Sequence, residues 1–580
     1  MTLPSFRKLH GHYFVFGLTC LLLLWGPGGA TALAQSVAAS GQIGPTVEAR
    51  RGMVVCVAPP AAKVGLDTLK RGGSAVDATV AVAFALAVTW PEAGNIGGGG
   101  FMLVTPQRGS PPVCIDYREM APASATRDMF AHGTNYKGHR VVGVPGTVAG
   151  MALAHQRYGR LSWQSLIEPA ALLARDGFEI DAALARGLNG LLAADGSDFP
   201  ELERVFAQPN GGQWQPGDRL LQPELAVTLE RIAKQGPDAF YRGAIAQQIV
   251  AEMRAGRGLV TFNDLAAYRA VIRDPVRGRF GDFDVYGPPP PSSGGIVVVQ
   301  TLNILEALDL PRRKRWSSES PHLIVEAMRR SYCDRARYLG DPDFVQIPSH
   351  LTNKAYARQL ALTISDEQAT ASEELAPELA IADEGASTTH FSIVDQRGMA
   401  VSNTYTIERS FGSRVVVSGA GFLLNNEMTD FNHRPGYTER TGMIGTEANT
   451  VAPRKRMLSS MCPVIVTRRG QPVLLTGSPG GRTIPNTVLN VVLGVCHYGE
   501  DLRAAVDAPR LHHSWFPDAV FFEATNDTDY ADIVAGLRER NHIVRSLPGP
   551  QGDAHSIWVD GGLLIGVADQ RRTAAVAAGW

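Results

Sequence analysis

Two kinds of hydrophobic pattern follow each other along the chain. In the first part, Ala- and Leu-rich stretches at helical spacing predict helices, as in AAKVGLDTLK, SAVDATVAVAFALAVT, LIEPAALLARDGF and AVTLERIAKQG. Gly72-Gly73 separates the first two of these helices, and PPPPSSGGI is a loop that leads into another. In the later part, HFSIVD, MAVSNTYTI and PVIVTRRGQPVLLTGS alternate or are rich in β-branched residues, which is typical of strands. The chain therefore mixes helices with β-hairpins.

The hairpin formed by HFSIVD and MAVSNTYTI has a readable register. The loop QRG separates its strands, and a three-residue hairpin loop commonly places glycine last, in the left-handed conformation. With Arg397 at the centre, Ile393 lies opposite Val401, and Thr388 lies opposite Thr406. Opposed residues of an antiparallel pair share a face, with Cβ atoms about 4.5–5.5 Å apart. Two threonine hydroxyls are therefore predicted to meet, although Thr–Thr pairs are also common in ordinary sheets.

Composition places the chain among ordinary globular proteins. Of 580 residues, 44% are hydrophobic and 19% are charged, and the net charge is -1. This length exceeds the roughly 250–300 residues at which single cores stop growing, so several core layers or more than one domain are expected. The near-zero charge gives no reason to expect nucleic acid or an anionic membrane as partner.

The first 34 residues have the pattern of a secretory signal peptide. Arg7 and Lys8 precede an apolar run over residues 13–25, and Ala32-Leu33-Ala34 is an A-x-A cleavage site. An uncleaved membrane anchor is the alternative, but the run is shorter than the roughly 20 residues that a spanning helix needs. We therefore expect cleavage after Ala34, no stable membrane anchor, and a periplasmic or secreted protein.

The cysteines that remain after this cleavage do not form a recognisable site. They are far apart, odd in number and without a CxxC spacing; they are Cys56, Cys114, Cys333, Cys462 and Cys496. A small disulfide scaffold is excluded by size, and zinc ligation has no supporting pattern. We expect them to be buried small hydrophobic residues, and the sequence implies no metal.

The octamer TTHFSIVD, which begins at Thr388, resembles the self-cleavage site of the γ-glutamyltranspeptidase (glutathione hydrolase) family of N-terminal nucleophile hydrolases. Further blocks resemble that family in the family's own order, between about residues 52 and 486. They include GGSAVDATVAVAFALAVTWPEAGNIGGGGFMLV, DYREMAPASATRDMF, GVPGTVAG, PPPPSSGGI, GFLLNNEMTDFN, KRMLSSMCP and GSPGG. Several independent blocks in order are far more specific than one short motif.

The resemblance implies a four-layer αββα sandwich and an inactive precursor that cuts itself between Ser387 and Thr388. Residues 35–387 would form a large subunit and residues 388–580 a small one, held together as a tight heterodimer. After the cut, Thr388 becomes an N-terminal residue with a free α-amine. Such an amine has a pKa of about 7.7–8.0, which suits a general base near neutral pH. A threonine paired with its own amine is a recognised activated nucleophile.

The same resemblance assigns roles around this nucleophile. Thr406 would hydrogen-bond the Thr388 hydroxyl, in agreement with the hairpin register. Gly480 and Gly481, in GSPGG, would supply the backbone N–H groups of an oxyanion hole, since glycine lets the backbone approach the substrate closely. An ordinary turn is the alternative for GSPGG when it is taken without the other blocks.

A γ-glutamyl group carries a carboxylate and an ammonium on its α-carbon, and both must be bound. Arg118, in DYREM, matches the family's carboxylate-binding arginine, and its guanidinium suits that partner. Ser459 and Ser460 match the hydroxyl pair beside it. Glu427 and Asp430, in NNEMTD, match the ammonium-binding acids. Taken singly, such charged residues are more often surface ion pairs or caps.

Two positions depart from the family pattern. Glu408 stands where the family often has asparagine, so it either binds the ammonium or pairs with Arg409 or Arg414. In the loop of residues 431–457, which covers the site in family members with a lid, Thr441 stands where a gating tyrosine is expected, with Tyr437 nearby. A looser lid would admit water and acceptors more freely and would favour hydrolysis over transfer.

Three functions are compatible with these residues. The first is a γ-glutamyltransferase and glutathione hydrolase that acts on glutathione and related γ-glutamyl compounds and passes the group to water or to an amino acid or dipeptide. The second is a glutaryl- or cephalosporin-type acylase of the same fold, against which the ammonium-binding acids argue. The third is an uncut, non-catalytic secreted binding protein. No organic cofactor is implied.

Overall fold

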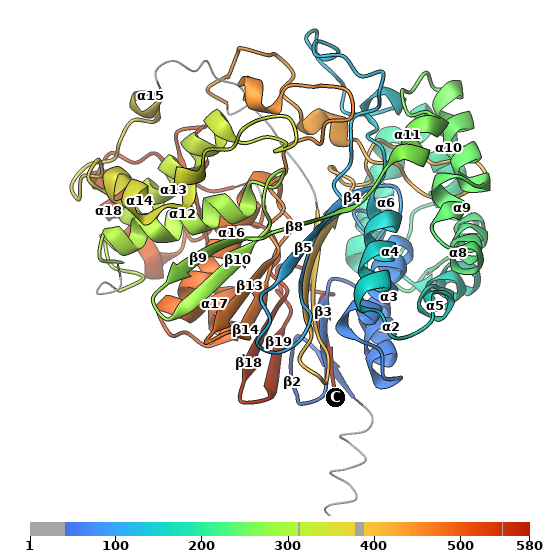
Figure 1. The fold of residues 1–580 in the computed structure, drawn as a ribbon, viewed down its shortest axis with the longest axis horizontal. Coiled ribbons are helices and arrows are strands. Elements are labelled where there is room, and N and C mark those ends of the chain that lie inside the picture. The colour runs from blue at the N-terminus through green and yellow to red at the C-terminus, as the bar shows by residue number, and fades with distance from the viewer. Residues whose placement is uncertain (1–40, 311–313, 377–387, 442–443, 548) are drawn as a thin grey trace, which may run out of the picture. The chain divides into compact units, whose positions relative to one another are not determined.

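Two stacked antiparallel sheets form the centre of the molecule (Figure 1). The computed structural model describes residues 41–310, 314–376, 388–441, 444–547 and 549–580, and Gln42–Trp580 form one compact unit. The expected signal peptide lies outside the described residues. The first sheet contains, in spatial order, β1 (Gln42–Gly44), β20 (Val576–Gly579), β3 (Met53–Cys56), β11 (Thr389–Val394), β12 (Ala400–Thr406), β4 (Gly99–Thr105), β5 (Val113–Asp116) and β8 (Val271–Arg273).

The second sheet packs against the inner face of the first. Its order is β2 (Thr46–Ala49), β19 (Leu563–Val567), β18 (Ser556–Asp560), β14 (Gln471–Thr476), β13 (Val464–Arg468), β10 (Phe283–Gly287) and β9 (Val276–Phe280). Val55, Leu103 and Leu475 belong to one buried apolar cluster between the two sheets. Alternation along each strand sends the neighbouring residues outward, where the helices cover them.

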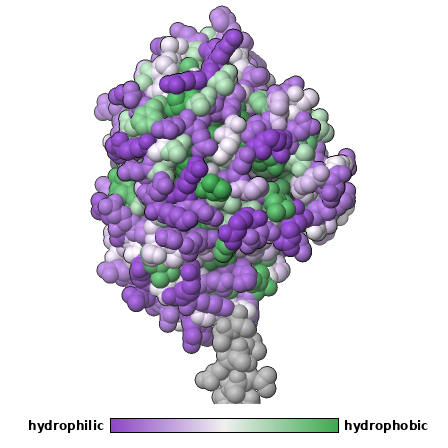
Figure 2. Space-filling model, turned by 90° about the vertical axis from the view of Figure 1, so that its right-hand side faces the viewer, coloured by the Kyte–Doolittle hydropathy of each residue, from purple (hydrophilic) through white to green (hydrophobic). Residues whose placement is uncertain are grey.

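One layer of helices covers the outer face of the first sheet. It includes α2 (Pro59–Lys70), α3 (Ala75–Thr89), α4 (Thr147–Tyr158), α5 (Trp163–Asp176), α6 (Ala182–Asp195), α8 (Pro223–Gln235) and α10 (Ala244–Ala255). Every residue of α3 is buried, as expected for a helix that is apolar on all sides, and the Ser74–Asp77 capping box starts it. The outward side of this layer is mainly hydrophilic, with apolar residues in small scattered groups (Figure 2).

A second helical layer covers the other sheet. It includes α12 (Gly294–Ala307), α13 (Ser320–Tyr338), α14 (Lys354–Ala361), α16 (Ile484–Val492) and α17 (Leu502–Asp507). Val298 and Leu302 of α12 pack with Val464 and Leu474 of the sheet in one buried cluster. The four layers are therefore helix, sheet, sheet and helix, which confirms the αββα sandwich.

The helices and hairpins expected from the sequence form where the pattern places them. The first two expected helices are α2 and α3, separated at Gly72-Gly73, and Gly72 has a φ of +89°. Ile393 pairs with Val401 in the β11–β12 hairpin, and Gly398 has a φ of +83°. Both the predicted register and the left-handed glycine are confirmed.

The five cysteines beyond residue 34 are free thiols. Four of them are buried and Cys496 is half-buried, as expected of small hydrophobic residues. Within the described ranges, no helix is long and apolar enough to cross a bilayer.

Candidate active site

A cavity of about 300 Å³ opens at one end of the two sheets and brings the predicted site residues together. Its lining includes all of the expected catalytic and substrate-binding positions: Arg118, Thr388, Thr406, Glu408, Glu427, Asp430, Ser459, Ser460, Gly480 and Gly481. Ser387, the residue expected on the other side of the cut, lies outside the described residues. The sequence blocks that carried these residues are far apart in the chain, so the fold has to assemble them.

Thr388 stands directly before β11 and is 4% exposed. Its Oγ1 donates to Thr406 Oγ1 at 3.4 Å, and Thr406 Oγ1 also accepts from the backbone N–H of Glu408 at 2.8 Å. A separation of 3.4 Å is long for a hydroxyl pair, whose usual distance is about 2.7–2.8 Å. Catalytic hydrogen bonds often tighten only when substrate is bound. The expected meeting of the two hydroxyls is confirmed.

His390 links the nucleophile strand to the second sheet. Its Nδ1 lies 2.8 Å from Thr404 Oγ1 and its Nε2 lies 3.0 Å from Ser392 Oγ, and burial lowers its pKa well below the ordinary value. The ring lies against Gly477, where an added Cβ would come within 2.3 Å of His390 Nδ1. Gly477 begins the GSPGG loop, so a neutral histidine sets the spacing between that loop and β11.

The GSPGG loop follows β14 and leads into η7 (Gly481–Thr483) and α16. Gly480 has a φ of +127° and Gly481 a φ of +56°, and both are in the region that favours glycine. Gly480 O accepts from the Thr483 backbone N–H at 3.1 Å, which fixes the turn. Backbone N–H groups at the start of a helix favour negative charge, so the loop is suited to stabilise an oxyanion.

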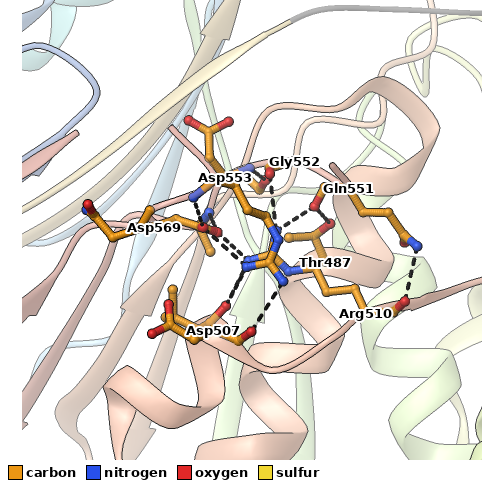
Figure 3. A network of polar contacts seen from close by, with 12 residues as sticks. Thr487, Asp507, Arg510, Gln551, Gly552, Asp553 and Asp569 are labelled. Atoms are coloured by element: carbon orange, nitrogen blue, oxygen red, sulfur yellow. Dashed lines mark hydrogen bonds and ion pairs between the residues drawn. The ribbon is translucent and has the colours of Figure 1, made fainter. Parts of the chain in front are cut away.

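A buried arginine, Arg510, holds a neighbouring segment of the chain in place (Figure 3). Arg510 donates to the backbone oxygens of Gln551 and Gly552, at 2.5 and 3.2 Å, and pairs with Asp569. Burial acts to raise the pKa of Asp569, but Arg510 and Arg571 hold it at about 2. A Cβ added to Gly552 would meet Ser478 Oγ at 2.2 Å, so the held segment lies directly against GSPGG. Sequence reasoning missed Arg510 because no short motif marks it.

The acids expected to bind an ammonium lie around Arg118. Arg118 Nη1 lies 2.5 Å from Glu427 Oε2 and 3.4 Å from Glu119 Oε2, and Nη2 pairs with Asp430. Arg118 and these acids are thus ion-paired with one another, which the sequence pattern did not predict. The physical reason is that a buried cation and buried anions are costly unless they neutralise one another.

Glu427, one acid of this cluster, can still accept hydrogen bonds. Apart from the ion pair with Arg118, neither carboxylate oxygen of Glu427 has a hydrogen-bond partner among the residues that the structure describes. Burial raises the pKa of Glu427 well above its ordinary value, with Glu119 and Asp430 adding to the effect and Arg118 opposing it. Burial likewise raises the pKa of Glu119 to about 7. A second cation brought into this cluster would stabilise the ionised carboxylates.

The two serines line the same cavity as Arg118. Ser459 is buried and its Oγ accepts from the Met461 backbone N–H at 3.1 Å, while Ser460 Oγ accepts from Arg335 Nη2 at 3.0 Å. Arg335 also lines the cavity and donates from Nε to Ser293 Oγ at 3.0 Å. Sequence reasoning did not identify this arginine, which belongs to α13 and lies in none of the quoted blocks.

Glu408 has a φ of +75° and is buried. Its Oε2 accepts from Asn426 Nδ2 and lies 3.5 Å from Arg409 Nε. Of the two arginines considered for it, Arg414 pairs with Asp195 at 2.6 Å instead. Glu408 therefore lines the cavity while it is held by Asn426 and Arg409.

The region expected to act as a lid does not place an aromatic ring over the cavity. Tyr437 is 52% exposed, and neither it nor Thr441 lines the site. Ile444 and Asn449 of the same loop do line it. In the part of the chain that the structure describes, no group of three or more His, Cys, Asp or Glu residues is arranged to hold a metal ion.

An αββα sandwich with a threonine at the start of a central strand, facing a second threonine and a glycine turn, defines the class of N-terminal nucleophile hydrolases. Within that class, the family model described as gamma-glutamyltranspeptidase matches residues 61–579. The chain belongs to the γ-glutamyltranspeptidase family.

Curated relatives and solved structures agree with this assignment. The chain is 44% identical over 543 residues to the glutathione hydrolase proenzyme of Escherichia coli K12, covering 92% of this chain and 93% of that protein. It is 37% identical over 554 residues to the glutathione hydrolase proenzyme of Bacillus subtilis 168, covering 90% and 91%. The crystal structure of a cephalosporin acylase from Bacillus halodurans superimposes with a TM-score of 0.81 at 28% identity, over 92% of this chain and 97% of that one. The γ-glutamyltranspeptidase of Helicobacter pylori gives a TM-score of 0.52 at 38% identity, over 54% and 91%.

Proposed function

We propose that this protein is a self-processing γ-glutamyl hydrolase and transferase that acts on glutathione and related γ-glutamyl compounds. The observation that carries the proposal is one cavity in which Thr388 faces Thr406 and the GSPGG turn while Arg118 and three carboxylates lie beside them. The proposed nucleophile and the groups that would bind the α-carboxylate and α-ammonium of a donor thus line one cavity. Curated relatives named glutathione hydrolase proenzyme support both the substrate class and the precursor.

Self-cleavage begins when the Thr388 hydroxyl attacks the Ser387 carbonyl carbon. The C–N bond to Thr388 breaks as its nitrogen takes a proton, and an ester joins Ser387 to Thr388 Oγ1. Water then cleaves the ester, which leaves a carboxylate on Ser387 and a free hydroxyl and α-amine on Thr388. That amine supplies the base that an internal threonine lacks.

Turnover repeats this chemistry on the substrate. The α-amine of Thr388 accepts the hydroxyl proton while Oγ1 attacks the γ-carbonyl carbon. The N–H groups of Gly480 and Gly481 stabilise the oxyanion that forms. The leaving amine takes the proton and departs, which leaves a γ-glutamyl ester on Thr388. Water releases glutamate from this ester, or an amino acid or dipeptide amine takes the γ-glutamyl group.

Donor binding is an exchange of ion pairs. The α-carboxylate of the donor accepts from Arg118, with Ser459 and Ser460 beside it, and the ammonium approaches Glu427, Asp430 and Glu408. The contacts of Arg118 to Glu427 and Asp430 are given up in part for contacts of each charge to the donor. The donor brings one charge of each sign, so the net charge of the cluster is unchanged and buried groups are not left without partners.

The large subunit would be residues 35–387 and the small subunit residues 388–580, held as a heterodimer. The matched crystal chain of the Helicobacter pylori enzyme is covered to 91% but reaches only 54% of this chain, as expected if that enzyme consists of separate chains. The signal-peptide pattern of residues 1–34 supports export to the periplasm or the exterior, with the precursor cut after Ala34.

The second candidate is a glutaryl-type acylase, which the structural likeness to a cephalosporin acylase favours. A glutaryl group has no ammonium, so it would leave the buried carboxylates of Glu427 and Asp430 with Arg118 as their shared cation. The acceptor capacity of Glu427 favours a donor that carries an amine.

The direct test is a denaturing gel with N-terminal sequencing and a product assay with a γ-glutamyl donor, with and without a dipeptide acceptor. Wild type should give two bands, the smaller beginning Thr-Thr-His. Thr388→Ala should abolish both the cut and turnover. Thr388→Ser should keep part of each, and Thr406→Ala should slow both less severely. Full activity in uncut protein, or normal cleavage in Thr388→Ala, would show that the mechanism is wrong.

A further inference from the structure

The end of the sandwich opposite the active site carries a group of exposed arginines, which we call the basic end. Its members lie in turns between strands or at a strand end: Arg50, Arg51, Arg108, Arg397, Arg468 and Arg469. Thr388 precedes β11 and Arg397 follows it, so one strand spans the distance between the two ends. The turns that follow β2 and β18 lie at the lower edge of Figure 1, beside the carboxyl end of the chain.

Four of these arginines surround a hollow of about 430 Å³. Arg50, Arg108, Arg468 and Arg469 line it, and Trp558 forms part of its wall. Arg468 lies 3.5 Å from Asp282, but no ion pair joins Arg50, Arg108 or Arg469 to a carboxylate of the described residues. Their guanidinium groups are therefore available to an outside anion.

Few negative charges oppose the basic end. The exposed acids in the turns and strand ends of this region are Glu48, Asp282 and Asp560. Asp395 does not count, because it is buried and is paired with Arg160 at 3.2 Å and with amides of its own hairpin. The surplus of arginines contrasts with the net charge of -1 for the whole chain.

The chain also enters the fold at this end. β1 begins at Gln42, which pairs with Gly579, and Gly579 pairs with Met53 beside Val394 of the β11–β12 hairpin. The expected cleavage site after Ala34 is separated from Gln42 by residues 35–41, which can reach at most about 25 Å.

We propose that the basic end is a docking face for anionic phospholipid surfaces. Guanidinium groups bind phosphate oxygens in bidentate fashion, and several of them on one face act together. Each arginine near such a surface is expected to raise partitioning by about fivefold, and salt should weaken the attraction. The active-site cavity would then face away from the lipid. This proposal does not depend on the substrate of the enzyme.

The test is sedimentation of the processed protein with phosphatidylglycerol-containing vesicles and with phosphatidylcholine vesicles. Wild type should bind the first and not the second, and high salt should release it. Arg50→Gln/Arg108→Gln/Arg469→Gln should reduce partitioning by roughly a hundredfold. The matched control is Arg186→Gln/Arg254→Gln/Arg538→Gln, which removes the same charge from exposed helical positions elsewhere.

The control should bind like wild type, and both variants should keep full activity on a γ-glutamyl donor. Equal loss in the control, binding that ignores lipid charge, or no binding at low salt would overturn the proposal. Full competition by millimolar inorganic phosphate at constant ionic strength would also overturn it, because it would indicate a small-anion site rather than a docking face.

Discussion

The donor recognition that we propose rests on Arg118, which is already paired with the acids that would bind the donor's ammonium. Glu427 and Asp430 share Arg118 as their cation. The site therefore distinguishes donors by whether they carry a positive charge as well as a negative one. A γ-glutamyl donor brings both a carboxylate and an ammonium, so it supplies new partners for Arg118 and for the acids whose ion pairs it weakens. A glutaryl donor brings only a carboxylate, so it competes with the acids for Arg118.

Asp430→Asn tests this discrimination. A charge-assisted hydrogen bond contributes about 1.5–3 kcal/mol, so kcat/KM for a γ-glutamyl donor should fall roughly tenfold to a hundredfold. For a glutaryl donor it should change little or rise, since one competing carboxylate is gone. Glu408→Asn should be milder on the γ-glutamyl donor, because the amide retains an acceptor. Steady-state kinetics with both donors provide the measurement, and equal losses on both would assign Asp430 to the fold alone.

The pH dependence of Glu427 makes a separate prediction. Burial raises its pKa, so it gains a proton as pH falls through that raised value and then no longer attracts an ammonium. kcat/KM for a γ-glutamyl donor should therefore rise with pH through this range, in addition to the rise expected from the Thr388 amine. Glu427→Gln should remove the rise in kcat/KM that is due to Glu427 and keep the rise that is due to the Thr388 amine.

A glutaryl donor is the internal control for this profile. With wild type it should show the rise due to the Thr388 amine without the one due to Glu427, because it has no ammonium. Identical pH profiles for both donors and for both proteins would contradict the assignment.

At the scale of the elements, the spacing between β11 and the GSPGG loop sets the distance from Thr388, the proposed nucleophile, to the proposed oxyanion hole. Gly477 is the contact point, because its backbone lies against the His390 ring. His390 is in turn held by Thr404 and Ser392, so the ring cannot withdraw without losing buried hydrogen bonds. The polar residues on the inner faces of the sheets thus align two catalytic elements.

Gly477→Ala should separate these elements. Overpacking a buried site typically costs about 1–3 kcal/mol, so the thermal midpoint should fall and both self-cleavage and kcat should drop. Gly190→Ala in α6 is the matched control, because nothing lies within 4 Å of its added Cβ. Alanine in a helix should leave stability equal or slightly higher there. Wild-type processing and kcat in Gly477→Ala would contradict the role given to this contact.

At the scale of the molecule, the proposed cut before Thr388 would not separate two domains. In the first sheet, β3 and β4 come from before Thr388, while the strands between them, β11 and β12, come from after it. In the second sheet, β2 and β10 lie on either side of β19, β18, β14 and β13. The two fragments therefore share both sheets and all three interfaces between layers.

The fragments should consequently behave as one folding unit. After processing they should elute together in size-exclusion chromatography at the mass of the heterodimer. They should separate only in denaturant, with circular dichroism and fluorescence reporting the same transition. An uncut Thr388→Ala protein is the reference for the intact chain. Dissociation of the fragments without loss of secondary structure would contradict the interleaved arrangement.

The amino-acid sequence by itself determined the local structure and the identity of the reactive groups. Hairpin register follows from the period of two and the position of Gly398, so Thr388 opposite Thr406 was predictable. The α2–α3 break was predictable from Gly72-Gly73. The αββα class and the site residues came from the resemblance, because family blocks keep their order along the chain.

The arrangement of the charged groups and of the residues that support the site became evident from the folded chain. Arg118, Glu427 and Asp430 were identified, but their mutual ion pairs depend on burial that no linear pattern shows. Arg335 and Arg510 act across the fold on Ser460 and Gly552, which are distant in sequence. The net charge of -1 gave no sign of the basic end. A sum of charges along the chain does not show which turns lie close together in space.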